Sequence, residues 1–129
     1  MRVFLVRHAE AARGEPDELR PLTALGRERA RELGKLLAAD GVRPAAVLTS
    51  PLLRARETAE EIARATGATA EPDDRLAPGA TLDDLRATVA GRGDPVVVVG
   101  HQPDCGSIAA ALTGEEPAFP AGGMHVLQL

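Results

Sequence analysis

The sequence predicts a single three-layer α/β/α domain with a mostly parallel central sheet, and three observations lead to this fold class. Short apolar runs alternate with longer segments of helical periodicity over residues 1–129, as in α/β proteins. The run Val96–Val99 is apolar at every position, which is typical of a strand covered on both faces in a parallel sheet. A length of 129 residues with 44% hydrophobic residues suits one domain with a substantial core.

The first third of the chain predicts a strand, a loop and a helix. Val3–Val6 is short, apolar and rich in β-branched residues, so it predicts a buried strand. Residues 11–20 are polar and contain Gly and Pro, so they predict a loop. Thr23 is a favoured N-cap residue, and Gly41 is a suitable C-terminal cap for the helix between them. The expected buried face of this helix consists of Gly26, Ala30, Leu33 and Leu37.

The middle of the chain predicts a second strand, a second helix and a weaker strand. Residues 45–49 form a short apolar run. Ser50 and Pro51 are favourable residues for a helix start, so we expect them to open the second helix. That helix should end at Gly67, and residues 69–74 then predict a strand at the edge of the sheet.

The last third predicts two more helices and two more strands. Residues 81–90 should be helical, because Asp83 and Asp84 stand in the first turn, where the helix dipole favours negative charge. After the strand at Val96–Val99, residues 100–103 predict a tight turn into a helix over residues 104–112. Residues 124–129 predict a closing strand.

Composition narrows the possible functions. With a net charge of −4 and no Trp or Tyr, the chain offers neither a general attraction for nucleic acid or membranes nor aromatic platforms for bases. We therefore expect no nucleic-acid or membrane partner. The single cysteine, Cys105, fits a reducing compartment, and no signal peptide or membrane span is predicted. These features lead us to expect a cytoplasmic protein.

Basic side chains follow three of the predicted strands. Arg7 and His8 come after the first, Arg54 stands one turn into the helix after the second, and His101 follows the Val96–Val99 strand. Parallel strands bring their carboxyl ends to one edge of a sheet, where ligands bind in α/β proteins. Arginine pairs bidentately with phosphate, and histidine can accept a phosphoryl group. The sequence therefore predicts a phosphate site at this edge.

Four segments carry a family resemblance that covers nearly the whole chain. They are Leu5-Val6-Arg7-His8-Ala9-Glu10, Arg20-Pro21-Leu22-Thr23-Ala24-Leu25-Gly26, Val47–Thr58 with its Ser-Pro-x-x-Arg-Ala-x-x-Thr pattern, and Val98-Val99-Gly100-His101. In this order they resemble the motifs of the histidine phosphatase superfamily, which includes the cofactor-dependent phosphoglycerate mutases. The short length and the form of the second segment are most similar to the SixA-type phosphohistidine phosphatases.

The resemblance implies a role for each matching residue. His8 would be the nucleophile that becomes phosphorylated, Arg7 and Arg54 would clamp the phosphoryl oxygens, and His101 would stabilise the transferring group. Arg20 would lie at the rim and could meet the substrate. No metal or other cofactor is expected, because the two arginines already supply the charge that a cation would.

The chain departs from the family in two places. Ala9 replaces the usual Gly, a small change at a tight turn. Many relatives also carry a Glu, near residues 76–79 of this chain, that protonates the leaving oxygen, and no carboxylate stands there. Asp104, Asp17 and Glu18 stay open as substitutes. A poor alkoxide leaving group needs a general acid, whereas the imidazole of a phosphohistidine needs much less help. This difference favours a phosphohistidine on a protein as substrate.

Three functions remain open. A phosphohistidine phosphatase ranks first, a broad phosphomonoesterase for small molecules second, and a phosphate-binding module without turnover third. Mutase activity ranks lower, because the chain lacks the insertions that enclose a mutase substrate. A cysteine phosphatase would need Arg at position 111, where Ala111 stands, and the histidines and Cys105 have no metal-ligand spacing. His125 and Cys105 are expected to be structural.

Overall fold

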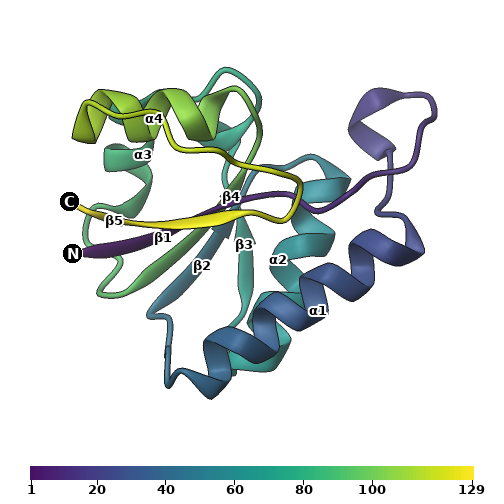
Figure 1. Cartoon of the computed structure of the whole chain (residues 1–129), viewed down its shortest axis with the longest axis horizontal. Helices are drawn as coiled ribbons and strands as arrows, with labels where there is room; N and C mark the ends of the chain where they lie inside the picture. The colour runs from purple at the N-terminus through teal and green to yellow at the C-terminus, as the bar shows by residue number, and fades with distance from the viewer.

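The computed structural model describes all residues 1–129 and contains one five-stranded sheet flanked by helices (Figure 1). The strands are β1 (Arg2–Arg7), β2 (Ala46–Thr49), β3 (Ala70–Pro72), β4 (Val96–Gly100) and β5 (Met124–Gln128). The helices are α1 (Ala24–Ala39), α2 (Leu53–Thr66), α3 (Leu82–Val89) and α4 (Asp104–Thr113), with 3₁₀ turns at Asp17–Leu19 and Asp74–Leu76. The elements occur in the order that the sequence predicts.

The sheet has the strand order β3-β2-β4-β1-β5. The four strands from β3 to β1 pair in parallel, and β5 runs antiparallel to β1 at the other edge. β4 lies at the centre, and every one of its residues is buried, as its unbroken apolar sequence predicts. The predicted α/β/α fold class with a mostly parallel sheet is therefore confirmed.

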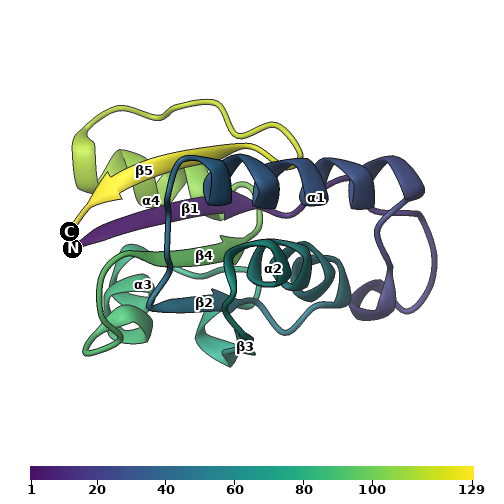
Figure 2. The same ribbon diagram turned by 90° about the horizontal axis from the view of Figure 1, so that it is seen from below.

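Helices cover both faces of this sheet (Figure 2). One apolar core lies on the side of α1 and α2 and includes Phe4, Leu37 and Ile62. The other lies on the side of α3 and α4 and includes Leu5, Leu85 and Ile108. Successive side chains of a strand point to opposite faces, so β1 supplies Phe4 to one core and Leu5 to the other.

The predicted helix ends agree with the structure at most positions but not at the start of α2. Thr23 caps α1 by accepting a hydrogen bond from the Gly26 N–H, and Gly67 closes α2 in the left-handed conformation. Ser50, in contrast, does not cap α2, because the N-cap position is Leu52 and no side chain bonds there. The prediction that Ser50 opens the helix is therefore wrong, and its hydroxyl lies in the sheet-edge cluster described below.

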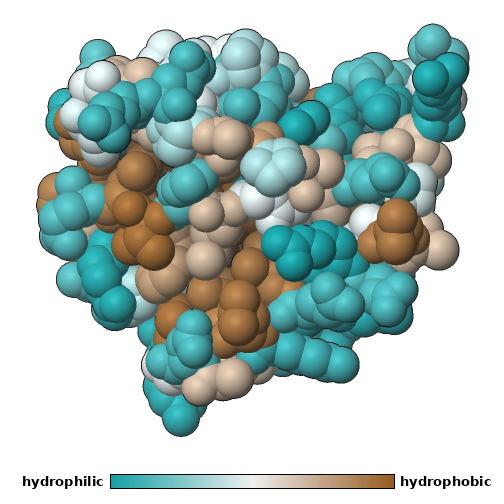
Figure 3. Space-filling view, in the orientation of Figure 1, coloured by the Kyte–Doolittle hydropathy of each residue, from teal (hydrophilic) through white to brown (hydrophobic).

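Exposed apolar side chains are few on this molecule. Leu19, Leu25, Leu36 and Val126 are the large ones. On the face shown in Figure 3, brown patches lie over β5 and α1 among mostly hydrophilic residues. None of the helices has the length and apolar character that crossing a membrane requires.

Candidate active site

The carboxyl ends of β1, β2 and β4 lie side by side and bring the predicted site residues together. Arg7 is in register with Gly100, and Thr49 is in register with Val99. The ladder continues past the strands, because the His8 N–H donates to the Gly100 carbonyl over 3.0 Å. The residues that follow these strands are thus fixed at one edge of the sheet.

His8 is held in one tautomer by its own backbone. Its Nδ1 lies 2.7 Å from the carbonyl oxygen of Ala9. A carbonyl oxygen only accepts, so Nδ1 carries the proton and Nε2 keeps a free lone pair. Burial lowers the pKa of His8 below its ordinary value of 6.5, the hydrogen bond to Ala9 opposes this shift, and the charges of Arg54 and Arg7 lower the pKa further. The ring is therefore neutral near pH 7 and its Nε2 can act as a nucleophile.

Arg7 presents a donor without a partner. Its Nη1 donates to the carbonyl oxygen of Phe119 over 3.0 Å, which fixes the guanidinium against the segment before β5. Its Nε is buried and makes no hydrogen bond within the chain. Such orphaned buried donors are rare in proteins and call for a partner. An anion at the sheet edge would supply one.

Arg54 lies near the first residues of α2 and is nearly buried, with 7% of its surface exposed. Its Nη1 donates to the backbone carbonyl of Asp17 over 2.9 Å, and its Nη2 lies 3.3 Å from Asp17 Oδ2. The other carboxylate oxygen of Asp17 accepts from Arg20 Nη1 over 3.0 Å. Asp17 therefore joins Arg20, the expected rim residue, to Arg54. Sequence reasoning did not predict this contact.

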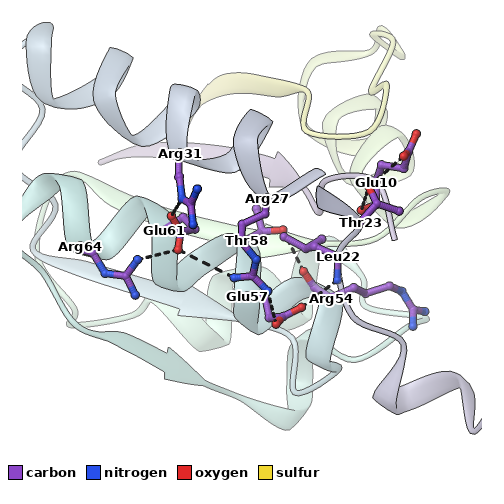
Figure 4. Close-up of polar contacts among 10 residues, drawn as sticks. All are labelled: Glu10, Leu22, Thr23, Arg27, Arg31, Arg54, Glu57, Thr58, Glu61 and Arg64. Carbon is purple, nitrogen blue, oxygen red and sulfur yellow. Dashed lines mark hydrogen bonds and ion pairs between the residues drawn. The ribbon is translucent and has the colours of Figure 1, made fainter. Parts of the chain in front are cut away.

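Hydrogen bonds from the neighbouring segments hold the start of α2 in place, as Figure 4 shows in part. The Thr58 hydroxyl donates to the Arg54 carbonyl over 2.8 Å and accepts from the Ala9 N–H over 3.1 Å. The Glu57 carboxylate accepts from the Leu22 N–H over 2.8 Å. These bonds tie the backbone after His8 and the segment before α1 to the helix that carries Arg54.

Gly26 allows α1 to approach the backbone that follows His8. The Thr23 N–H donates to the Glu10 carbonyl over 3.0 Å, which brings the first turn of α1 against residue 10. A Cβ atom at position 26 would lie only 2.1 Å from the Glu10 oxygen. Glycine at this position is therefore required by the close approach of two backbones.

His101 lies beside His8 with its ring centroid 5.3 Å away. Its Nε2 lies 2.7 Å from the Ser50 Oγ, and both residues are buried. Burial lowers the pKa of His101 from 6.5 to about 4, and the charges of His8 and Arg54 act in the same direction. The ring is therefore neutral near pH 7 and can act as a hydrogen-bond donor. Two guanidiniums and two imidazoles thus form a site suited to a dianion.

Two of the three open candidates for a general acid, Asp17 and Asp104, are engaged in other contacts. The hydrogen bond from Arg20 is the largest cause of a lowered pKa at Asp17, and Arg54 adds to it, so this carboxyl group is ionised near neutral pH. Asp104 Oδ2 accepts from the Gly79 N–H over 2.8 Å, which makes it an anchor for the loop before α3. Glu18 is exposed.

The remaining histidine and the cysteine lie outside this cluster. His125 stacks edge-on against Phe119 and lies 2.7 Å from the Ala118 carbonyl. Cys105 is buried, and burial raises the pKa of its thiol to about 12. No three side chains of His, Cys, Asp or Glu are arranged to hold a metal ion.

Comparisons with known proteins found similar sequences and a similar solved structure. The family described as "Histidine phosphatase superfamily (branch 1)" matches residues 3–78. Phosphohistidine phosphatase SixA of Escherichia coli K12 is 34% identical, over 91% of this chain and 78% of that protein. An uncharacterised protein of Picosynechococcus is 38% identical, over 98% of this chain and 78% of that protein. The solved structure of protein histidine phosphatase SixA with tungstate is 32% identical with a TM-score of 0.89, over 100% of this chain and 88% of that chain.

Proposed function

This chain belongs to the histidine phosphatase superfamily and is a phosphatase, and from that premise we propose that it hydrolyses phosphohistidine on a partner protein through an intermediate on His8. The similarity to SixA of Escherichia coli, which is named a phosphohistidine phosphatase, supports this substrate class. We further propose that the catalytic domain spans residues 1–129, that it needs no metal, and that it acts in the cytoplasm.

The observation that carries the proposal is that Asp17 and Asp104, two of the candidates for a general acid, are engaged in other contacts. Asp17 is ionised against two arginines, and Asp104 is bonded to Gly79. An alkoxide leaving group needs such a donor, whereas an imidazole protonated on its far nitrogen departs as a neutral ring. The chemistry available at this site therefore suits a P–N bond better than a P–O bond.

In the proposed first step, the Nε2 lone pair of His8 attacks the phosphorus while the P–N bond of the substrate breaks and its electron pair stays with the departing imidazole. Arg7 and Arg54 bind the phosphoryl oxygens, and His101 donates a hydrogen bond to them. Charge stabilisation of this kind is usually the largest part of phosphoryl-transfer catalysis. In the second step water attacks phosphorylated His8, which releases inorganic phosphate and regenerates the free ring.

The test compares phosphate release from a phosphohistidine-bearing protein and from p-nitrophenyl phosphate, with and without EDTA, for wild type and His8→Ala. We expect faster release from phosphohistidine, no effect of EDTA, and no activity in His8→Ala. Faster hydrolysis of the phosphomonoester would favour the small-molecule phosphomonoesterase. Inorganic phosphate binding without turnover of either substrate would favour the phosphate-binding module.

A further inference from the structure

The buried pair Ser50 and His101 places a hydroxyl against one ring nitrogen of a residue that the proposed mechanism uses. Ser50 directly follows β2, and His101 directly follows β4. The Ser50 N–H donates to the Val99 carbonyl over 3.0 Å, so the ladder between the strands sets the position of Ser50. Its Oγ lies 2.7 Å from Nε2 of His101.

The hydrogen bonds of Ser50 determine the direction of this contact. The Leu52 N–H donates to Ser50 Oγ over 3.2 Å, and a backbone N–H can only donate. The hydroxyl proton of Ser50 then needs an acceptor of its own. Ser50 is fully buried, and Nε2 of His101 is the acceptor that its hydroxyl reaches in the chain. If Nε2 were protonated instead, two donors would face each other, or the hydroxyl proton would stay buried and unpaired.

We propose that Ser50 is a positioning residue that donates its hydroxyl proton to Nε2 of His101 and thereby keeps the ring proton on Nδ1. A neutral imidazole carries one proton, so an acceptor at Nε2 means a donor at Nδ1. This inference rests on the proposed role of His101 at the phosphoryl group. Nδ1 makes no hydrogen bond within the chain, so its proton is free for a phosphoryl oxygen.

The two histidines are held in matching ways. The Ala9 carbonyl accepts from Nδ1 of His8 and leaves its Nε2 as a nucleophile, whereas the Ser50 hydroxyl donates to Nε2 of His101 and leaves its Nδ1 as a donor. The pair therefore offers one acceptor for phosphorus and one donor for a phosphoryl oxygen. The low pKa of His101 agrees with a ring that stays neutral over the working range.

Nitrogen-15 NMR of the histidine rings tests the tautomer directly, without substrate. We expect wild-type His101 at pH 7 to be neutral, with a protonated Nδ1 and a bare Nε2. In Ser50→Ala we expect the proton to move toward Nε2, the preferred site in free neutral histidine. A wild-type ring protonated on Nε2, or on both nitrogens, would overturn the proposal and leave the phosphohistidine substrate untouched.

Kinetics give the second measurement. For Ser50→Ala we expect kcat to fall about tenfold to a hundredfold with little change in KM, by analogy with the loss of hydrogen-bond partners of metal-ligating histidines. Ser50→Thr keeps the hydroxyl and should restore most of kcat if the extra methyl group fits. Ser107→Ala is the matched control, because Ser107 is exposed on α4. An unchanged kcat in Ser50→Ala, in a folded protein whose His101 tautomer is also unchanged, would contradict the proposal.

Discussion

Arginines gather in two regions of this molecule, and the regions differ in how completely acidic groups match the positive charge. Between α1 and α2, Arg27, Arg31 and Arg64 surround the carboxylates of Glu57 and Glu61 (Figure 4). At the sheet edge, the one carboxylate is that of Asp17, which pairs with Arg54 and Arg20 but not with Arg7.

The difference shows how a binding site can be told from a structural ion-pair network. In the α1–α2 network every arginine contacts a carboxylate of the chain, and the pairs of Arg27 with Glu57 and of Arg31 with Glu61 join the two helices. The sheet edge leaves a buried Nε of Arg7 without a partner and positive charge in excess. Unmatched buried charge is costly for folding, and a site that keeps it gains affinity for an anion.

Removing Arg54 should have the largest effect on activity. We expect Arg54→Ala to lower kcat/KM by about 10²- to 10³-fold, because the loss of one preorganised donor to a transferring group has this cost. Arg54→Lys should remain strongly impaired, since an ammonium cannot reproduce the planar fork. Initial rates on a phosphohistidine protein measure both effects.

Arg64→Ala is the matched control, because Arg64 lies on the same helix, pairs with Glu61, and is 70% exposed. Its kcat/KM should stay within about twofold of wild type, as for most exposed ion-pair residues. Equal losses in Arg54→Ala and Arg64→Ala would remove the distinction between the two regions.

Removing Glu61 should affect stability far more than catalysis. Its side chain is 5% exposed and accepts from Arg31 over 3.0 Å and from Arg64 over 2.6 Å. Glu61→Ala leaves like charges near one another without an acceptor, and we expect a loss of about 2 kcal/mol in the free energy of unfolding. Urea denaturation measures this loss, and Glu61→Gln should recover part of it. A stable Glu61→Ala protein with low kcat/KM would place this network in the catalytic machinery.

Sequence patterns predicted much of the sheet-edge cluster but could not separate the two groups of arginines. Arg7 ends β1, and His8 and His101 directly follow β1 and β4, so the rule that parallel strand ends meet was sufficient to bring them together. Arg54 and Arg64 stand on one helix, and Arg64 pairs with Glu61 three residues earlier on that helix. Arg54 instead meets Asp17, which only the packing of residues 12–20 brings near it. Ser50 was misassigned because a serine after a strand suits a helix cap as well as a partner for a neighbouring strand.

Acid should destabilise the protein through the sheet-edge cluster. The pKa of His101 is about 4 in the folded protein and 6.5 in the unfolded chain. Below pH 6.5 the unfolded chain therefore binds a proton at this residue that the folded chain does not bind. The stability that depends on neutral His101 is therefore fully present above pH 6.5 and is lost as the pH falls toward 4. We expect the shifted pKa of His101 to lower the free energy of unfolding by about 2 kcal/mol between pH 7 and pH 5. The pKa of His8 is also lowered, so this residue acts in the same direction.

Urea denaturation of wild type and His101→Asn at pH 7 and pH 5 measures this contribution. The variant should lose less stability over this interval than wild type, because the group that resists protonation is gone. An identical pH dependence in both proteins would mean that His101 is protonated in the folded state, and the pocket would then be less shielded from water than its burial indicates.

Substitution of Asp17 should have the smallest effect, and it compares the ion pair at the sheet edge with those between α1 and α2. Its side chain is 60% exposed and its carboxylate lies 3.3 Å from Arg54 Nη2, so it would have to give way if a phosphoryl oxygen binds this guanidinium as proposed. In Asp17→Asn the side chain that competes with phosphate for Arg54 loses its charge. Inorganic phosphate should therefore inhibit the variant about threefold more strongly than wild type, a modest change typical of exposed ion pairs. Glu18→Gln also replaces a carboxylate by an amide, at the next residue, and should leave the inhibition constant for inorganic phosphate unchanged. Weaker inhibition in Asp17→Asn would mean that Asp17 orients Arg54 for the anion. The Asp17–Arg54 pair would then fix the geometry of the sheet-edge site, as the Arg31–Glu61 pair joins α1 and α2.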